Sequence, residues 1–112
     1  MMVCLNLFEL NMKFNHFAYL FLGPNLDPKI HRSEIKTDQL TFITIGMDFK
    51  SKELSLEIAK NLVAEGAQMI ELCGGFGPLW IAKISEAIGY SIPVGSVAYG
   101  PEARKPLLDL LS

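Results

Sequence analysis

One stretch of the sequence combines residues that could bind a ligand or carry out chemistry. It spans residues 71–78, reads ELCGGFGP, and follows an apolar segment. This order predicts a strand, a tight glycine-rich loop and a helix N-terminus. Glycines let backbone N–H groups approach a ligand closely, and the helix adds a partial positive charge. The stretch therefore predicts a site for an anionic or carbonyl-bearing small molecule at Gly74, Gly75, Phe76 and Gly77.

Three side chains are candidates for catalysis at this site. Glu71 falls in the predicted strand, where a buried carboxylate makes an acid/base candidate. The alternatives are a structural ion pair with Arg32, Arg104 or a lysine, and an interface salt bridge. Cys73 stands close to a helix N-terminus, which lowers the pKa of a thiol; the alternative is a small buried apolar residue. His31 lies on the first connection between strands, either facing the same edge of the sheet or on the surface.

The ends of the other predicted strands supply further candidates. Ligands of an open parallel sheet bind beyond the carboxyl ends of its strands. Gly23 and Asn25 follow one predicted strand and Tyr99 ends another, so we add these three residues to the predicted ligand site. Glycine also ends strands for turn geometry alone. The loop lacks the lysine of a P-loop and the glycine spacing of a dinucleotide fingerprint, so no particular cofactor is indicated.

Continuous apolar or β-branched runs predict four strands, at residues 14–22, 41–47, 68–73 and 92–99. Helical spacing and capping residues predict helices at 28–35, 51–66 and 78–88. Pro106 predicts a break near Lys105, followed by a short leucine-rich helix.

Strands that alternate with helices predict a small three-layer α/β domain with a four-stranded, mainly parallel sheet. The flavodoxin-like strand order 2-1-3-4 is favoured. The alternative is a ferredoxin-like α+β domain with some antiparallel pairing, because the first connection is short. The domain is expected to span residues 13–112, with residues 1–12 as a leader outside the core or as an element used in assembly.

Composition limits the functional classes. Half of the 112 residues are hydrophobic, which is rich for a small domain and predicts a homo-oligomer, most simply a dimer. A net charge of −2 predicts no nucleic-acid partner. The apolar leader is interrupted by polar residues, so it predicts neither a membrane span nor a signal peptide. Cys4 and Cys73 have no metal-binding spacing and indicate a reducing cytoplasm.

Several short segments accompany the stretch 71–78: FLGP at 21–24, DP at 27–28, HR at 31–32, PVG at 93–95 and YG at 99–100. Together they resemble a family of small bacterial proteins that is catalogued only as a domain of unknown function. The resemblance covers about residues 14–103, and the stretch 71–78 is its most specific part. The resemblance implies a compact α/β domain and supplies no activity.

Two functions therefore stay open. The first is a small-molecule site at the glycine-rich loop, with or without catalysis. The second is a non-catalytic oligomeric binding or regulatory module in which the same loop packs a subunit contact. A molecule bound in the loop would favour the first, and a loop buried by another subunit would favour the second.

Overall fold

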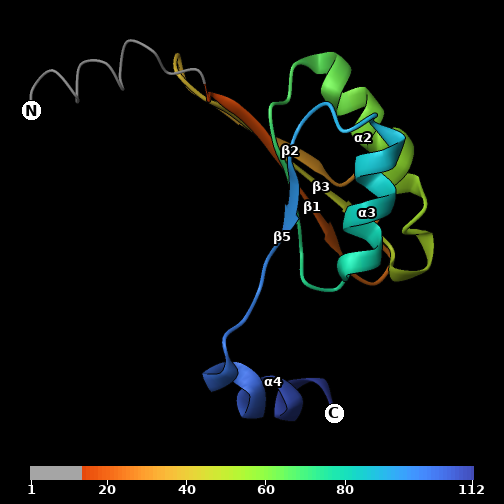
Figure 1. Cartoon of the computed structure of the whole chain (residues 1–112), viewed down its shortest axis with the longest axis vertical. Coiled ribbons are helices and arrows are strands. Elements are labelled where there is room, and N and C mark those ends of the chain that lie inside the picture. The colour runs from red at the N-terminus through yellow and green to blue at the C-terminus, as the bar shows by residue number, and fades with distance from the viewer. Residues whose placement is uncertain (1–13) are drawn as a thin grey trace, which may run out of the picture.

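The structure, a computed structural model, describes residues 14–112. The predicted leader lies outside the described residues, so its separation from the core stays a prediction. The described chain forms one five-stranded sheet in the order β2-β3-β1-β4-β5 (Figure 1). The strands are β1 His16–Leu22, β2 Arg32–Lys36, β3 Thr41–Met47, β4 Ile70–Leu72 and β5 Val94–Ser96. The helices are α2 Leu54–Glu65, α3 Pro78–Ala87 and α4 Arg104–Leu111, with 3-10 turns η1 Phe49–Ser51 and η2 Pro101–Ala103.

The sheet is mixed and mostly parallel, which confirms the α/β class. Strand β1 runs parallel to both β3 and β4, and β5 runs parallel to β4. Strand β2 pairs antiparallel with β3 and forms one edge. The prediction of four strands was therefore wrong, and the flavodoxin-like order is not confirmed, because β2 extends the sheet beyond β3.

The predicted helix at 28–35 is also wrong, for a local reason. Asp27 does accept a hydrogen bond from the Lys29 N–H at 2.9 Å, as a helix cap would. The N–H groups of Ile30 and His31 both donate to the Asp27 carbonyl. These hydrogen bonds close a turn that does not continue into a helix. The residues that follow pair with the free edge of β3, with Glu34 opposite Ile43. Capping residues start turns as well as helices, and the open strand edge decided the outcome.

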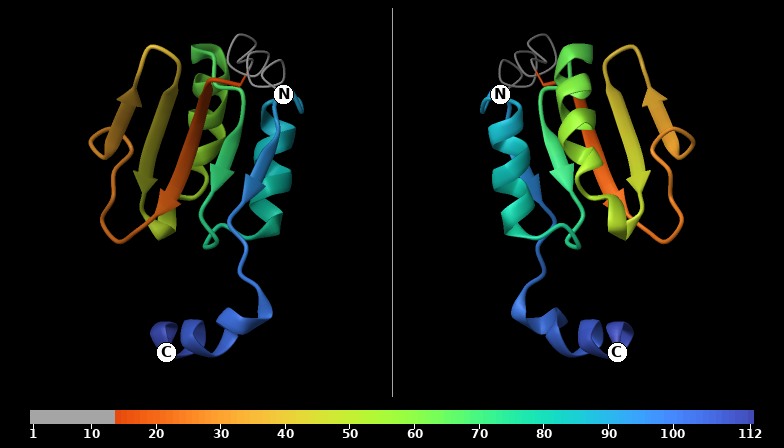
Figure 2. Two further views of the ribbon diagram at one scale, coloured as in Figure 1. Left: turned by 90° about the vertical axis from the view of Figure 1, so that its left-hand side faces the viewer. Right: turned by 90° about the vertical axis from the view of Figure 1, so that its right-hand side faces the viewer.

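Both long helices lie on the same face of the sheet (Figures 1 and 2). The core forms between them and the sheet, where Leu20 of β1, Leu62 of α2 and Ile84 of α3 have no exposed surface. Helix α2 ends at Gly66, whose φ of 107° is the left-handed conformation that favours glycine. Within residues 14–112 no helix lies against the opposite face, so the predicted third layer is not observed.

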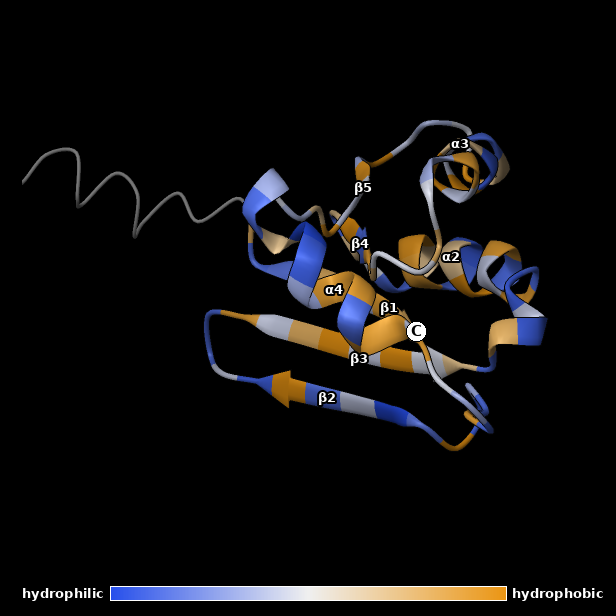
Figure 3. Cartoon of the chain, turned by 90° about the horizontal axis from the view of Figure 1, so that it is seen from below, coloured by the Kyte–Doolittle hydropathy of each residue, from blue (hydrophilic) through white to orange (hydrophobic). Residues whose placement is uncertain are grey.

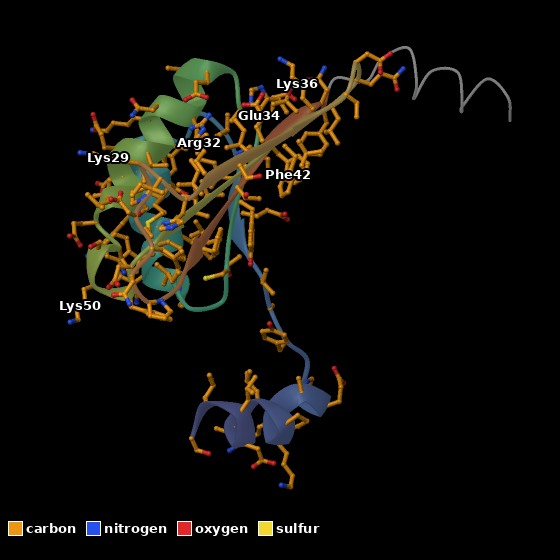
Figure 4. The ribbon with its side chains drawn as sticks, turned by 180° about the vertical axis from the view of Figure 1, so that it is seen from behind. Lys29, Arg32, Glu34, Lys36, Phe42 and Lys50 are labelled. Atoms are coloured by element: carbon orange, nitrogen blue, oxygen red, sulfur yellow. The ribbon has the colours of Figure 1, made fainter. Side chains whose placement is uncertain are left out.

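That opposite face carries aromatic side chains. Side chains alternate along a strand, and Ala18 and Leu20 of β1 are buried under the helices. The β1 residues that alternate with them, Phe17, Tyr19 and Phe21, therefore point to the other side. Figure 4 shows the Phe42 side chain on the side of the sheet away from α2 and α3. We call this surface the aromatic face; its rings are Phe14, Phe17, Tyr19, Phe21 and Phe42.

Helix α4 lies beyond the carboxyl edge of the sheet, apart from α2 and α3 (Figures 1 and 2). The predicted short C-terminal helix is confirmed, but the break near Lys105 is not. Helix α4 begins at Arg104, so Pro106 falls in its first turn. A proline there removes only an N–H group that has no acceptor within the helix.

Candidate functional site

A hollow of about 420 Å³ lies between the glycine-rich loop and α4, at the carboxyl edge of the parallel strands. Its wall combines the loop, the ends of β1 and β5, and two turns of α4. Apolar side chains form most of it, and the polar groups come from the loop backbone, a thiol and a phenol. The lining residues are Leu22, Phe49, Cys73, Gly74, Gly75, Val97, Tyr99, Leu107 and Leu111.

The sheet and the core hold the loop in place. The Cys73 N–H donates to the Leu20 carbonyl at 2.9 Å, and the Phe76 N–H donates to the Cys73 carbonyl at 3.1 Å, which closes a turn. Phe76 is almost fully buried and anchors the loop in the core. Within residues 14–112 the N–H groups of Gly74 and Gly75 donate no hydrogen bond. Two glycines with unpaired N–H groups thus lie in the wall of the hollow.

The loop glycines lie close to their neighbours. A Cβ added at Gly75 would stand 3.4 Å from Leu22 Cδ1, and one added at Gly74 would stand 3.6 Å from the Val97 carbonyl oxygen. Gly77 has a φ of 79° at the start of α3, a conformation that favours glycine. Side chains at the first two positions would therefore take space from the hollow, whereas Gly77 serves the backbone turn.

Four acidic groups share one electrostatic neighbourhood beside the hollow. Burial raises the pKa of Tyr19, and the negative forms of Cys73, Tyr99 and Glu71 raise it further. The Tyr19 hydroxyl therefore holds its proton more firmly than a free phenol does. Cys73 is half-buried, and its Sγ accepts a hydrogen bond from the Leu22 N–H at 3.4 Å. Sequence reasoning missed Tyr19, since it lies within an apolar strand and carries no motif.

The structure brings together four of the predicted site residues: Cys73, Gly74, Gly75 and Tyr99 line the hollow. Glu71 does not line it. The expectation that this carboxylate is buried is wrong, because Glu71 lies on the uncovered face of β4 and is exposed. Within residues 14–112 Glu71 forms no ion pair, and Arg32 pairs instead with Glu65 at 2.9 Å, so the expected ion pair inside the chain is wrong. The alternative of an interface salt bridge stays a prediction.

His31 lies at the far side of the sheet from the loop. Its carbonyl accepts from the Gly46 N–H, and its Nδ1 accepts from the Asp27 N–H at 2.8 Å, so it stabilises the turn before β2. Three strand spacings separate β2 from β4, which is about 14 Å. The expectation that His31 lies on the wall of the loop pocket was therefore wrong.

Gly23 and Asn25 also serve a turn, and neither lines the hollow. The Gly23 N–H donates to the Met47 carbonyl, and the Asn25 N–H donates to Asp48 Oδ2 at 2.7 Å. Backbone hydrogen bonds from Lys50 and Asn25 lower the pKa of the Asp48 carboxyl. The strand ends here are held by turn geometry, which was the alternative explanation for their glycines.

The apolar lining of the hollow was not predicted as a site. Phe49, Val97 and the α4 residues Leu107 and Leu111 have the same side-chain types as core residues, so no motif marks them. The one available signal is that Leu107 and Leu111 are four residues apart and lie on one side of a helix. Their position under the glycine loop depends on the chain path after β5.

A second hollow of about 340 Å³ lies on the helix side, between the turn before β2 and α2. Its rim carries the positive side chains Lys29 and Arg32 (Figure 4) and the negative side chain Glu65. Arg32 and Glu65 form an ion pair there. The Arg32 guanidinium is already paired with a carboxylate. This hollow is therefore a weaker candidate site for an anionic ligand than the hollow at the glycine-rich loop.

Two searches of residues 14–112, for a metal-binding group and for a membrane-spanning helix, found none. No group of three or more histidine, cysteine, aspartate or glutamate side chains in this part could hold a metal ion. No helix of the described segment is long and apolar enough to cross a membrane.

Comparison with known proteins identifies the family. Residues 15–112 match the family of unknown function DUF6506, and the chain belongs to it. The expected membership in a family without an assigned function is thus confirmed. No curated protein matches the chain. The matched residues span both the glycine-rich loop and α4.

Proposed function

We propose that this domain binds a small molecule in the hollow between the glycine-rich loop and α4. The ligand has an apolar body and a carboxylate or carbonyl head. One observation carries the proposal: Gly74 and Gly75, whose N–H groups donate no hydrogen bond within residues 14–112, line a mostly apolar hollow. Its volume of about 420 Å³ falls within the range of small-molecule sites.

The chemistry of the wall selects the head group. Among residues 14–112 no charged side chain lines the hollow, so the donors from this part are the loop N–H groups, the Cys73 thiol and the Tyr99 hydroxyl. The N-terminus of α3 follows the loop directly and adds partial positive charge. These groups favour an acceptor oxygen that carries negative charge, while Leu22, Leu107 and the other apolar residues favour a hydrocarbon body.

Catalysis stays a prediction. Of the three residues proposed for it from the sequence, only Cys73 lines the hollow, whereas Glu71 and His31 do not. A thiol beside two unpaired backbone donors is the arrangement that would attack a carbonyl carbon. Binding alone needs no such step, and the geometry supports binding first. The cytoplasmic location and the lack of a nucleic-acid partner also stay predictions.

A pair of ligands of equal length tests the proposal. Hexanoate carries a carboxylate head, and hexylammonium carries a cationic head that can accept no hydrogen bond. We expect saturation-transfer NMR on the full chain to detect hexanoate binding and at least tenfold weaker binding of hexylammonium. Gly75→Val should reduce hexanoate affinity at least tenfold, because its side chain enters the hollow beside Leu22.

Gly95→Val is the matched control, since a Cβ at Gly95 meets nothing within 4 Å. It should bind hexanoate as the unchanged chain does. Equal affinity for both ligands, or equal loss in the two glycine variants, would overturn the proposed site. Melting temperatures of both variants show whether the sheet has stayed folded.

The second candidate function is an oligomeric module in which the loop is covered by another subunit. The exposed leucines of α4 favour an assembled state. In that case the assembled protein would bind hexanoate no better than the Gly75→Val variant does. The same titration therefore separates the two functions.

A further inference from the structure

The aromatic face carries rings that contact one another across two strands. The ring centroids of Phe14 and Phe17 are 5.4 Å apart, and those of Phe17 and Phe42 are 4.5 Å apart. Tyr19 and Phe21 stack farther along β1, with centroids 6.2 Å apart. Ile35 of β2 lies opposite Phe42 in register and is 58% exposed, so the apolar surface continues to the sheet edge.

This surface lacks the cover that the other face has. Both α2 and α3 pack against the opposite side, and within residues 14–112 no helix lies against the aromatic face (Figure 2). Sheets bury an apolar face against another layer, and a contiguous exposed apolar patch marks an interaction surface. Aromatic residues are also enriched at protein interfaces. Phe14 and Ile35 are exposed and the other rings are partly exposed, so this face is a candidate interaction surface.

Helix α4 also has apolar surface that is not covered, because several of its leucines are exposed. Leu108 is 56% exposed, Leu110 is 78% exposed, and Leu111 is 74% exposed although it lines the ligand hollow with Leu107. Figure 3 shows hydrophobic and hydrophilic residues around α4. With only eight residues, a helix of this kind is marginal in water unless it packs on something.

We propose that α4 of one copy packs on the aromatic face of a second copy, and the reverse, in a two-fold dimer. The four leucines lie on one side of α4, and the ion-paired Lys105 and Asp109 lie on the other. Leu107, which is half-buried, stays beside the hollow of its own chain, and the exposed Leu108, Leu110 and Leu111 contact the rings of the partner. The exchange is reciprocal, so one patch pairing is used twice. This inference does not depend on the proposed ligand.

Three features point to a second copy as the occupant. The chain leaves β5 at the carboxyl edge and runs away from the sheet (Figure 1), so α4 would have to reverse direction to cover its own face. Helix α4 is about 12 Å long, close to the roughly 10 Å between β3 and β4. Within residues 14–112 Glu71 on this face and Arg104 at the start of α4 form no ion pair, and their charges are opposite.

Variants of the full chain separate the two halves of this interface. Phe42→Glu places a charge on the aromatic face, and the double variant Leu108→Glu, Leu110→Glu places charges on α4. Leu79→Glu is the matched control, because Leu79 is 61% exposed on α3, in the helix layer on the other side of the sheet. Sedimentation velocity at micromolar concentration should show twice the 12.4 kDa chain mass for the unchanged chain and the control. Both interface variants should sediment as monomers.

Mixing the two interface variants gives the sharpest result. The Phe42→Glu chain still has its α4, and the double variant still has its aromatic face, so the mixture restores one of the two contacts. We expect a heterodimer in the mixture at concentrations where each variant alone is monomeric. Ile35→Glu, at an exposed position, repeats the test if Phe42→Glu fails to fold by circular dichroism.

Three results would overturn the proposal. A monomer of the unchanged chain across the micromolar range means that a different protein, or the chain itself, covers the face. A dimer that survives the α4 double variant means that two aromatic faces pack on each other. Folded variants that stay monomeric when mixed mean that the contact is not exchanged between copies.

Discussion

The two faces of one sheet differ in what their strands offer to a covering layer. On the helix side β1 presents Ala18 and Leu20, which have no exposed surface. On the other side the same strand presents Phe17, Tyr19 and Phe21, all only partly buried. The aliphatic side chains pack against α2 and α3 of the same chain. No helix of residues 14–112 covers the rings, and this is the side to which we assign the partner's α4. Alternation along a strand thus gives one element two different surfaces.

The largest expected difference in stability is between two truncations, one on each face of the sheet. Leu20→Ala should lower the free energy of unfolding by about 3 kcal/mol, because it opens a cavity in the closed core. Phe42→Ala removes mainly its ring contact with Phe17 and should cost about 1 kcal/mol in the monomer. Urea unfolding at low protein concentration measures both. Equal losses would show that the aromatic face is covered within the chain.

A smaller effect distinguishes two glycines on the aromatic face. A Cβ at Gly46 would stand 2.8 Å from the ring of Phe21 and 2.8 Å from Leu26 Cδ1, so these side chains must move. Gly46→Ala should therefore cost about 1 kcal/mol. Gly95→Ala meets nothing within 4 Å and should change stability by less than about 0.5 kcal/mol. A neutral Gly46→Ala would mean that the Phe21 ring does not rest on β3.

The smallest effect is a pH dependence at Tyr19. Its folded-state pKa is raised above the ordinary 10.0, first by burial and then by neighbouring negative charges. The folded state thus favours the neutral phenol, a contribution that is complete below pH 10.0 and lost as the pH rises through the folded-state pKa. In the ultraviolet titration of the three tyrosines, one should ionise late, and Tyr19→Phe should remove that step. Three coincident titrations would contradict the raised pKa.

The parts of the fold that could be predicted are those with local signals. The runs around Leu20 and Ile45 predicted β1 and β3, and the glycine-rich stretch 71–78 predicted the turn between β4 and α3. Strand β2 could not be predicted, because Asp27 and Pro28 suit a turn and a helix start equally. Its exposed, charged residues became a strand only because β3 offers a free edge.

The candidate site was predicted in part for a similar reason. Cys73, Gly74 and Gly75 lie next to one another in the chain, so their common position follows from one local turn. Glu71 was misplaced because the prediction assumed helices on both sides of the sheet, and one side is open in the described chain. The α4 wall of the hollow depends on a chain path that no local pattern encodes.

Amide hydrogen exchange of α4 tests most directly whether the two unmatched surfaces cover each other. An eight-residue helix without a packing surface exchanges nearly as fast as an unfolded chain. We expect the α4 amides to be protected at high protein concentration and to lose protection on dilution, while the amides of β1 stay protected throughout. Exchange in α4 that is fast at every concentration, or equally slow at every concentration, would contradict the account.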